Sequence, residues 1–245
     1  MPDSMRSSLS PRVADPAPLA GRRLLAAITV VLAALAGNAS GADANALVER
    51  GAYLAAAGNC TGCHTRDGGA PFAGGVAFET DFGTLYSTNI TPDTETGIGN
   101  WSLEDFTAAM RRGERPGGEH LYPIFPYTSY TKVGDEDVAA IHAYLRTLAP
   151  VRYSPPDNAL DFPYDQRWAL GPWKALFFDE GRFEEQPERS AQWNRGAYLV
   201  EGLGHCGECH TPRNFLGALD EDLAFTGSTY FERIDGKLSA WSAPN

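Results

Sequence analysis

The chain has 245 residues, 43% hydrophobic and 11% aromatic, so it is long enough for one or two ordinary domains and too apolar for a disordered tail. Glycine and proline are numerous, at 26 and 17 residues, which indicates compact elements joined by turn-rich connections. The formal net charge of −11 makes nucleic acid and anionic lipid poor partners and favours a basic patch on another protein, although solubility alone would explain most of it.

Residues 1–42 have the layout of a secretory signal peptide. Arg22 and Arg23 precede the apolar run LLAAITVVLAAL, and the small residues of AGNASGADA follow, so we expect cleavage after Ala42 or Ala44. The alternative is an uncleaved anchor, but the run is shorter than the roughly 20 residues that a membrane span needs. The sequence therefore predicts an exported protein.

The four cysteines form two pairs of the same spacing, each followed directly by a histidine: Cys60, Cys63 and His64 in CTGCH, and Cys206, Cys209 and His210 in CGECH. A single pair could belong to a zinc site, a redox pair or a short disulfide. On a helix, positions i, i+3 and i+4 share one face, so two sulfurs can bind one porphyrin while the histidine binds its iron. A zinc site made from both pairs, or a redox disulfide, would need no histidine at that place. The doubling therefore favours covalent haem.

An internal repeat surrounds both motifs, because residues 50–65 read RGAYLAAAGNCTGCHT and residues 195–211 read RGAYLVEGLGHCGECHT. Two copies of one haem-binding domain are predicted. We expect a signal peptide at 1–42, a first domain over 43–150, a linker over 151–190 and a second domain over 191–245. The final WSAPN matches the YSTNI of the first copy, so the second domain is expected to be incomplete.

Three helices are predicted in the first copy. Leu47, Val48, Gly51 and Leu54 recur at helical spacing before the first cysteine. Ser102 and Asp105 form a capping box at the start of a helix that runs to about Arg112, and residues 135–148 form a third, stopped by Pro150.

Gly51 is unusual inside a helix, where it costs roughly 1 kcal/mol relative to alanine. A bare backbone there lets another helix cross closely, and the expected partner is the helix over 135–148. That helix carries Val138, Ile141, Leu145 and Leu148 on one face. The loops between the helices are rich in Gly, Pro and Thr, which fits a small all-α domain around a flat cofactor that supplies much of its core.

The linker over 151–190 is rich in aromatic residues, which a free linker would not need. They are expected to pack on the domain surfaces and to fix the two haems in mutual orientation: Tyr164, Trp168, Trp173, Phe177 and Phe178.

Several segments together resemble the multihaem cytochrome c subunits of periplasmic membrane-associated dehydrogenases. They are RGAYLAAAGNCTGCHT, LYSTNITPD, TGIGNWS, HLYPIFPYTSYTK and WALGPWKALFF, and the resemblance runs from about residue 47 to 245. It implies tandem cytochrome c domains and haem c, with Cys60, Cys63, His64, Cys206, Cys209 and His210 at the attachment and proximal-ligand positions. In that family three haem domains usually follow one another, and a third site and a membrane-associating C-terminal segment have no match here.

The same resemblance implies a function. The family serves dehydrogenases that oxidise alcohol, gluconate, sorbitol, fructose or aldehydes, and its haems pass electrons toward ubiquinone or a terminal oxidase. The expected role is therefore that of an electron-transfer subunit at the outer face of the inner membrane, with a catalytic dehydrogenase subunit as partner. Membrane association is expected through the partner or a C-terminal segment.

The sixth ligand of the first haem is left open by the sequence. The family often has methionine in its Tyr-Pro-x-x-Pro stretch, but Ile124 and Phe125 stand there, and the loop over 113–134 has no methionine. His120 could complete a bis-histidine site, with Lys132 or Met110 as weaker candidates; an open position would admit peroxide. His142 is expected on the flank of the last helix, and His205 in a turn too constrained to bind the opposite haem face.

Two alternatives from other classes remain at this point. One is an enzyme, a dihaem peroxidase with an open sixth position on its first haem, which the absent methionine favours and the family resemblance opposes. The other is a zinc-stapled binding module, which haem absorbance would exclude. No substrate-activating triad and no flavin or nicotinamide loop is recognisable.

Overall fold

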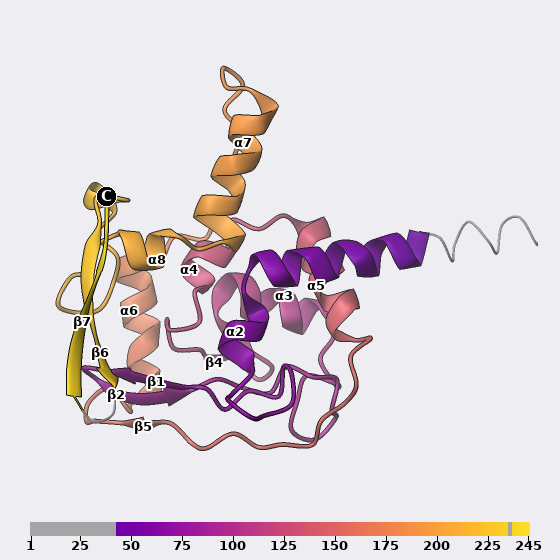
Figure 1. The fold of residues 1–245 in the computed structure, drawn as a ribbon, viewed down its shortest axis with the longest axis horizontal. Coiled ribbons are helices and arrows are strands. Elements are labelled where there is room, and N and C mark those ends of the chain that lie inside the picture. The colour runs from indigo at the N-terminus through magenta and orange to yellow at the C-terminus, as the bar shows by residue number, and fades with distance from the viewer. Residues whose placement is uncertain (1–42, 235–236) are drawn as a thin grey trace, which may run out of the picture. The chain divides into compact units, whose positions relative to one another are not determined.

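The computed structural model describes residues 43–234 and 237–245, shown in Figure 1. All described residues except 43 and 44 belong to one compact unit, which covers residues 45–245. The predicted signal peptide at 1–42 lies outside the described residues. Among the helices of the described part, none has both the length and the apolar character needed to cross a membrane.

The predicted helices of the first copy are present. A helix covers residues 43–57, and the further helices are α2 (Cys60–His64), α3 (Leu103–Arg112), α4 (Tyr127–Tyr130) and α5 (Asp135–Leu145). The predicted capping box of α3 is confirmed, because Asp105 N donates to Ser102 Oγ at 3.1 Å and Ser102 N donates to Asp105 Oδ2 at 2.9 Å. The Ser102 hydroxyl also donates to Asp105 Oδ2, at 2.7 Å, and this hydrogen bond together with that from Ser102 N lowers the pKa of the Asp105 carboxyl.

Short strands make the fold mostly helical rather than purely α-helical. The strands of the described residues are β1 (Ala77–Thr80), β2 (Gly83–Tyr86), β3 (Glu114–Arg115), β4 (Glu119–His120), β5 (Ala159–Leu160), β6 (Ser228–Ile234) and β7 (Lys237–Ala243). The antiparallel pair of β1 and β2 sets Phe78 opposite Leu85, and β5 pairs with β2. Strand β2 begins directly after the turn at Gly83, which has φ 113, a conformation that glycine adopts readily.

The linker and the second copy contribute η1 (Arg167–Ala169), α6 (Leu170–Phe177), α7 (Ala191–Tyr198), η2 (Leu199–Leu203), α8 (Gly207–His210) and η3 (Glu221–Leu223). The second RGAYL segment begins in α7 and continues into η2, a π-helical turn. Strands β6 and β7 follow α8 as an antiparallel pair, in the way that β1 and β2 follow α2 (Figure 1). The architecture after each motif is thus repeated.

Gly51 lies where the helix over 43–57 crosses α5, as predicted. A Cβ at Gly51 would lie 1.9 Å from the carbonyl oxygen of Ala140, so only a glycine permits this approach. Leu54 on the same helix is fully buried, whereas Leu47, expected on the same face, is 39% exposed. Helix α5 buries Val138, Ile141 and Leu145 and ends at Leu145, three residues before the predicted end.

The linker aromatics pack in part as expected. The Phe178 ring lies 5.3 Å from the Tyr127 ring of the first copy, and Trp173 Nε1 donates to the Leu216 carbonyl of the second copy at 3.0 Å. Trp168 differs, because 73% of its surface is exposed. The linker therefore contacts both copies; that it sets the orientation of two haems stays a prediction.

Candidate functional site

The first motif forms the short helix α2. Asn59, at φ 51, turns the chain directly before Cys60, and α2 then brings Cys60, Cys63 and His64 within little more than one helical turn. Both thiols are free. Burial raises the pKa of Cys60 to about 11 and also raises the pKa of Cys63, so that both sulfurs are protonated thiols at neutral pH.

The ring of His64 is oriented by the backbone. Its Nδ1 lies 2.7 Å from the carbonyl oxygen of Thr88, just after β2. Because a carbonyl only accepts, Nδ1 carries the proton and donates, which leaves the lone pair on Nε2. Burial lowers the pKa of His64, which keeps the ring neutral near pH 7. A neutral imidazole held through Nδ1 is the arrangement that proteins use for a metal-binding histidine.

The second motif repeats this arrangement. His205 adopts φ 40 directly before Cys206, and helix α8 carries Cys209 and His210. His210 Nδ1 lies 2.8 Å from the carbonyl oxygen of Pro244, just after β7. In the match of WSAPN to YSTNI, the residue directly before Pro244 corresponds to Thr88. The carbonyl that contacts His210 therefore lies one residue later than the match would place it. Both predicted proximal histidines therefore have the same kind of backbone partner.

Two further contacts recur after each motif. Thr65 Oγ1 accepts from Phe72 N and Thr211 Oγ1 accepts from Phe225 N, each at 3.1 Å, and both phenylalanines have φ near +60°. Gly74 N donates to His64 O at 2.7 Å, and Gly227 N donates to His210 O at 2.9 Å. Sequence reasoning missed these residues. The repeated CHT and the two Phe-x-Gly segments carry the signal, but the second copy has seven more residues between them.

The candidates for a sixth ligand have other partners. His120 Nδ1 lies 3.2 Å from Lys174 Nζ, Lys132 Nζ lies 3.0 Å from Glu201 Oε2, and Met110 is buried in the apolar core. The Lys174 ammonium also contacts the Arg112 carbonyl and Glu114 Oε1, so its three protons have three acceptors. His120 Nδ1 is then an acceptor, and the proton of the neutral ring is on Nε2.

The two remaining histidines pack against aromatic rings, and His142 lies on the last helix of the first copy, as predicted. His142 lies on α5 with its ring 5.2 Å from that of Phe106. The His205 ring packs edge-on against Tyr130 at 5.6 Å, held by the turn before Cys206. Within the described part of the chain, no group of three His, Cys, Asp or Glu side chains could hold a metal ion, so the two cysteine pairs are not brought together as a zinc site would need.

Comparison with known families matches residues 48–149 to cytochrome c. The matched residues therefore form a cytochrome c domain, and they contain the whole first motif. Cytochromes of this family hold haem covalently, so haem c is the cofactor of this domain.

Individual relatives extend the likeness beyond that domain. The chain is 52% identical over 199 residues to a subunit of the nicotinate dehydrogenase of Pseudomonas putida, covering 81% of this chain and 16% of that protein. It is 44% identical over 222 residues to the gluconate 2-dehydrogenase cytochrome c subunit of Pantoea cypripedii, covering 89% of this chain and 49% of that protein. A dihaem cytochrome c-type protein of Cereibacter sphaeroides is 44% identical over 188 residues, 73% of this chain and 62% of that protein. The chain thus spans less than two thirds of each of these relatives.

The residues present fit haem c. Each motif offers two unpaired thiols on one short helical segment and a histidine whose Nε2 is free to bind iron. The first motif adjoins the apolar core, since Cys60 packs against the cluster that includes Leu54 and Tyr130. The donor set is thus sulfur for the porphyrin and imidazole for the iron.

Proposed function

We propose that this chain is an exported electron-transfer cytochrome with two covalently bound haems. Cys60 and Cys63 would hold the first haem with His64 as iron ligand, and Cys206 and Cys209 the second with His210. The observation that carries the proposal is the repeated geometry, in which each histidine donates through Nδ1 to a backbone carbonyl at 2.7 or 2.8 Å. The match of residues 48–149 to cytochrome c supports the first site, and the repeat supports the second.

The chain's own residues would bind and orient the cofactor rather than transform a substrate. Haem supplies reversible one-electron chemistry at iron. The carbonyl oxygens of Thr88 and Pro244 fix the tautomer and the ring orientation of the two histidines. The apolar core that packs against Cys60 would provide an apolar wall for the first haem.

The division into tandem domains is part of the proposal. The first domain would cover 43–150, the linker 151–190 and the second domain 191–245. The matching hydrogen bonds after each motif support two copies of one unit. Contacts of the linker with both copies support a fixed arrangement of them.

A partner dehydrogenase is the proposed electron donor, and a quinone or a terminal oxidase the proposed acceptor. Relatives named as cytochrome subunits of gluconate and fructose dehydrogenases support this, at 44% and 45% identity. The predicted signal peptide supports a periplasmic location, with membrane association through a partner. The relatives' names give no support to a peroxidase.

The proposal is tested with the whole chain produced in the periplasm of a host that attaches haem. We expect c-type absorbance, reversible reduction, and rapid reoxidation of the reduced protein by a soluble quinone analogue, without turnover of hydrogen peroxide. Absence of haem would contradict the proposal. High-spin haem that turns over peroxide faster than it reduces the quinone analogue would instead establish the peroxidase.

A further inference from the structure

Glu208 places a carboxylate inside the second attachment turn, between Cys206 and His210. Its side chain is only 11% exposed. The first turn has Gly62 at the same position, and a Cβ there would lie 2.5 Å from Asn59 Oδ1. This largely buried carboxylate therefore distinguishes the second site from the first.

Helix α4 binds this carboxylate. Thr128 Oγ1 and Ser129 Oγ both donate to Glu208 Oε1, at 3.0 and 3.1 Å, and Arg213 pairs with Oε2. Helix α4 belongs to the loop of the first copy that precedes α5. A segment of the first copy thus supplies two of the groups that stabilise the charge in the second.

The same helix reaches the first attachment turn. The Tyr130 hydroxyl lies 3.4 Å from the carbonyl oxygen of Gly58, two residues before Cys60. The Tyr130 ring packs edge-on against His205, directly before Cys206, and only 5% of the residue is exposed. Helix α4 therefore lies between the two attachment turns and contacts both.

We propose that Glu208, held by α4, sets the reduction potential of the haem at the second site. This inference rests on the proposed function, since it requires haem at Cys206, Cys209 and His210. A nearby carboxylate stabilises ferric haem, which has one more positive charge than ferrous haem, and so lowers the midpoint potential. Burial reduces the screening of this interaction by solvent and salt. Because the first turn has a glycine there, this interaction makes the two potentials different and gives electron transfer between the haems a direction.

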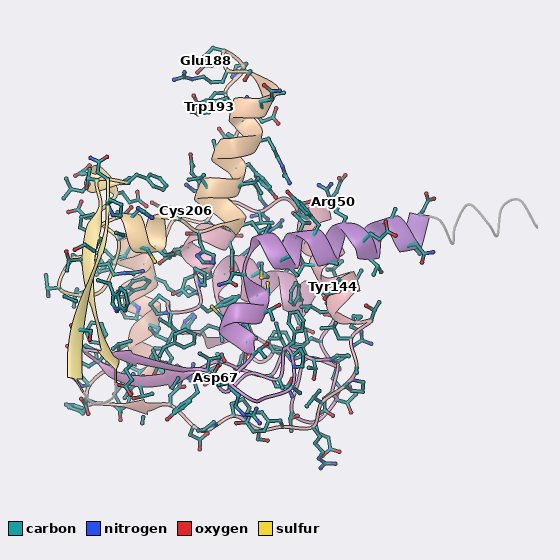
Figure 2. The ribbon with its side chains drawn as sticks, in the orientation of Figure 1. Arg50, Asp67, Tyr144, Glu188, Trp193 and Cys206 are labelled. Carbon is teal, nitrogen blue, oxygen red and sulfur yellow. The ribbon has the colours of Figure 1, made fainter. Side chains whose placement is uncertain are left out.

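The first test is Glu208→Gln in the haem-loaded whole chain, which removes the charge and keeps the shape. Potentiometric titration followed by absorbance and EPR should show the midpoint potential of the second haem shifted upward, with the first unchanged. The signal of the second haem is assigned as the one that is lost when Cys206→Ala and Cys209→Ala are combined in one chain. The control is Glu188→Gln, which changes an exposed carboxylate three residues before α7, beyond the end of that helix away from Cys206 (Figure 2), and should shift neither potential.

A second variant tests the contribution of α4 to this potential, and it is expected to shift the potential in the opposite direction. Thr128→Val together with Ser129→Ala keeps the Glu208 charge but removes two donors, so the second midpoint potential should shift downward. Haem stoichiometry is measured first. A wild-type chain without haem at the second motif would contradict the proposed function. When Glu208→Gln binds both haems, an unchanged potential of the second haem would overturn the inference. When Glu208→Gln fails to bind the second haem, the decision passes to the Thr128→Val, Ser129→Ala variant, where an unchanged potential would overturn it.

Discussion

Gly51 packs directly against the backbone of Ala140 where the first helix crosses α5, since a Cβ at position 51 would lie 1.9 Å from the Ala140 carbonyl oxygen. Gly51→Ala forces these backbones apart. We expect the free energy of unfolding of the haem-loaded protein to fall by about 3 kcal/mol or more, at the upper end of overpacking effects, because backbone has to move. Urea unfolding followed by far-ultraviolet circular dichroism measures the change.

The repeat provides a matched control at Gly196, in the second RGAYL segment. Among the described residues nothing lies within 4 Å of a Cβ built there. Gly196→Ala should leave the unfolding free energy unchanged or raise it by up to about 1 kcal/mol, through helix propensity. Equal losses at both glycines would show that the crossing with α5 is not what requires Gly51.

Tyr198 connects the second RGAYL segment to α5. Its hydroxyl donates to Asp137 Oδ2 at 2.7 Å and accepts from Gly134 N at 3.1 Å. Burial, with the Asp137 hydrogen bond, raises the pKa of Tyr198 from 10.0 to about 12. The folded state thus binds this proton more tightly than the unfolded state, so the contribution is complete below pH 10 and is lost between pH 10 and 12.

Tyr198→Phe should therefore cost about 1.5–3 kcal/mol of unfolding free energy at pH 7, the cost of breaking a hydrogen bond to a charged group. The difference from wild type should narrow as the pH rises from 10 to 12. Tyr53 is the equivalent residue of the first RGAYL segment and is 57% exposed, so Tyr53→Phe should have little effect at any pH. If the loss of unfolding free energy in Tyr198→Phe stays constant up to pH 12, the proposed link between the Tyr198 pKa and stability is contradicted.

His120 tests the sixth ligand of the first haem. The contact with Lys174 places the ring proton on Nε2, which removes the lone pair that iron would need. We expect His120→Ala to leave the low-temperature EPR spectrum of both haems unchanged. A change from low-spin to high-spin haem in this variant would show that His120 leaves Lys174 and binds iron in the haem-loaded protein.

Local sequence patterns predicted much of the first copy. The hydroxyl and carboxyl of Ser102 and Asp105 indicated the start of α3, and Gly51 indicated the helix crossing, because both effects depend on neighbouring residues or on one missing side chain. The β-hairpins were not predicted. They form between short segments whose pairing depends on glycine turns, and the sequence reads there as loop.

Some parts of the candidate site could likewise be predicted from the sequence and others could not. The cysteines and histidines were predicted because their spacing is local and repeated. The carbonyls of Thr88 and Pro244 were not, because a backbone oxygen has no side-chain signature and each lies 24 or more residues from its histidine. The contact of Glu208 with α4 spans about 80 residues and joins the two copies, so it follows only from the packing of the copies.

The most direct test of two covalent haems is the intact mass of the whole chain after denaturation, together with its pyridine haemochrome spectrum. We expect two haems per wild-type chain and one in each of the variants Cys60→Ala, Cys63→Ala and Cys206→Ala, Cys209→Ala. One haem in the wild-type chain, lost only with the first pair, would limit the cofactor to the first domain. A wild-type chain without covalent haem would contradict the account.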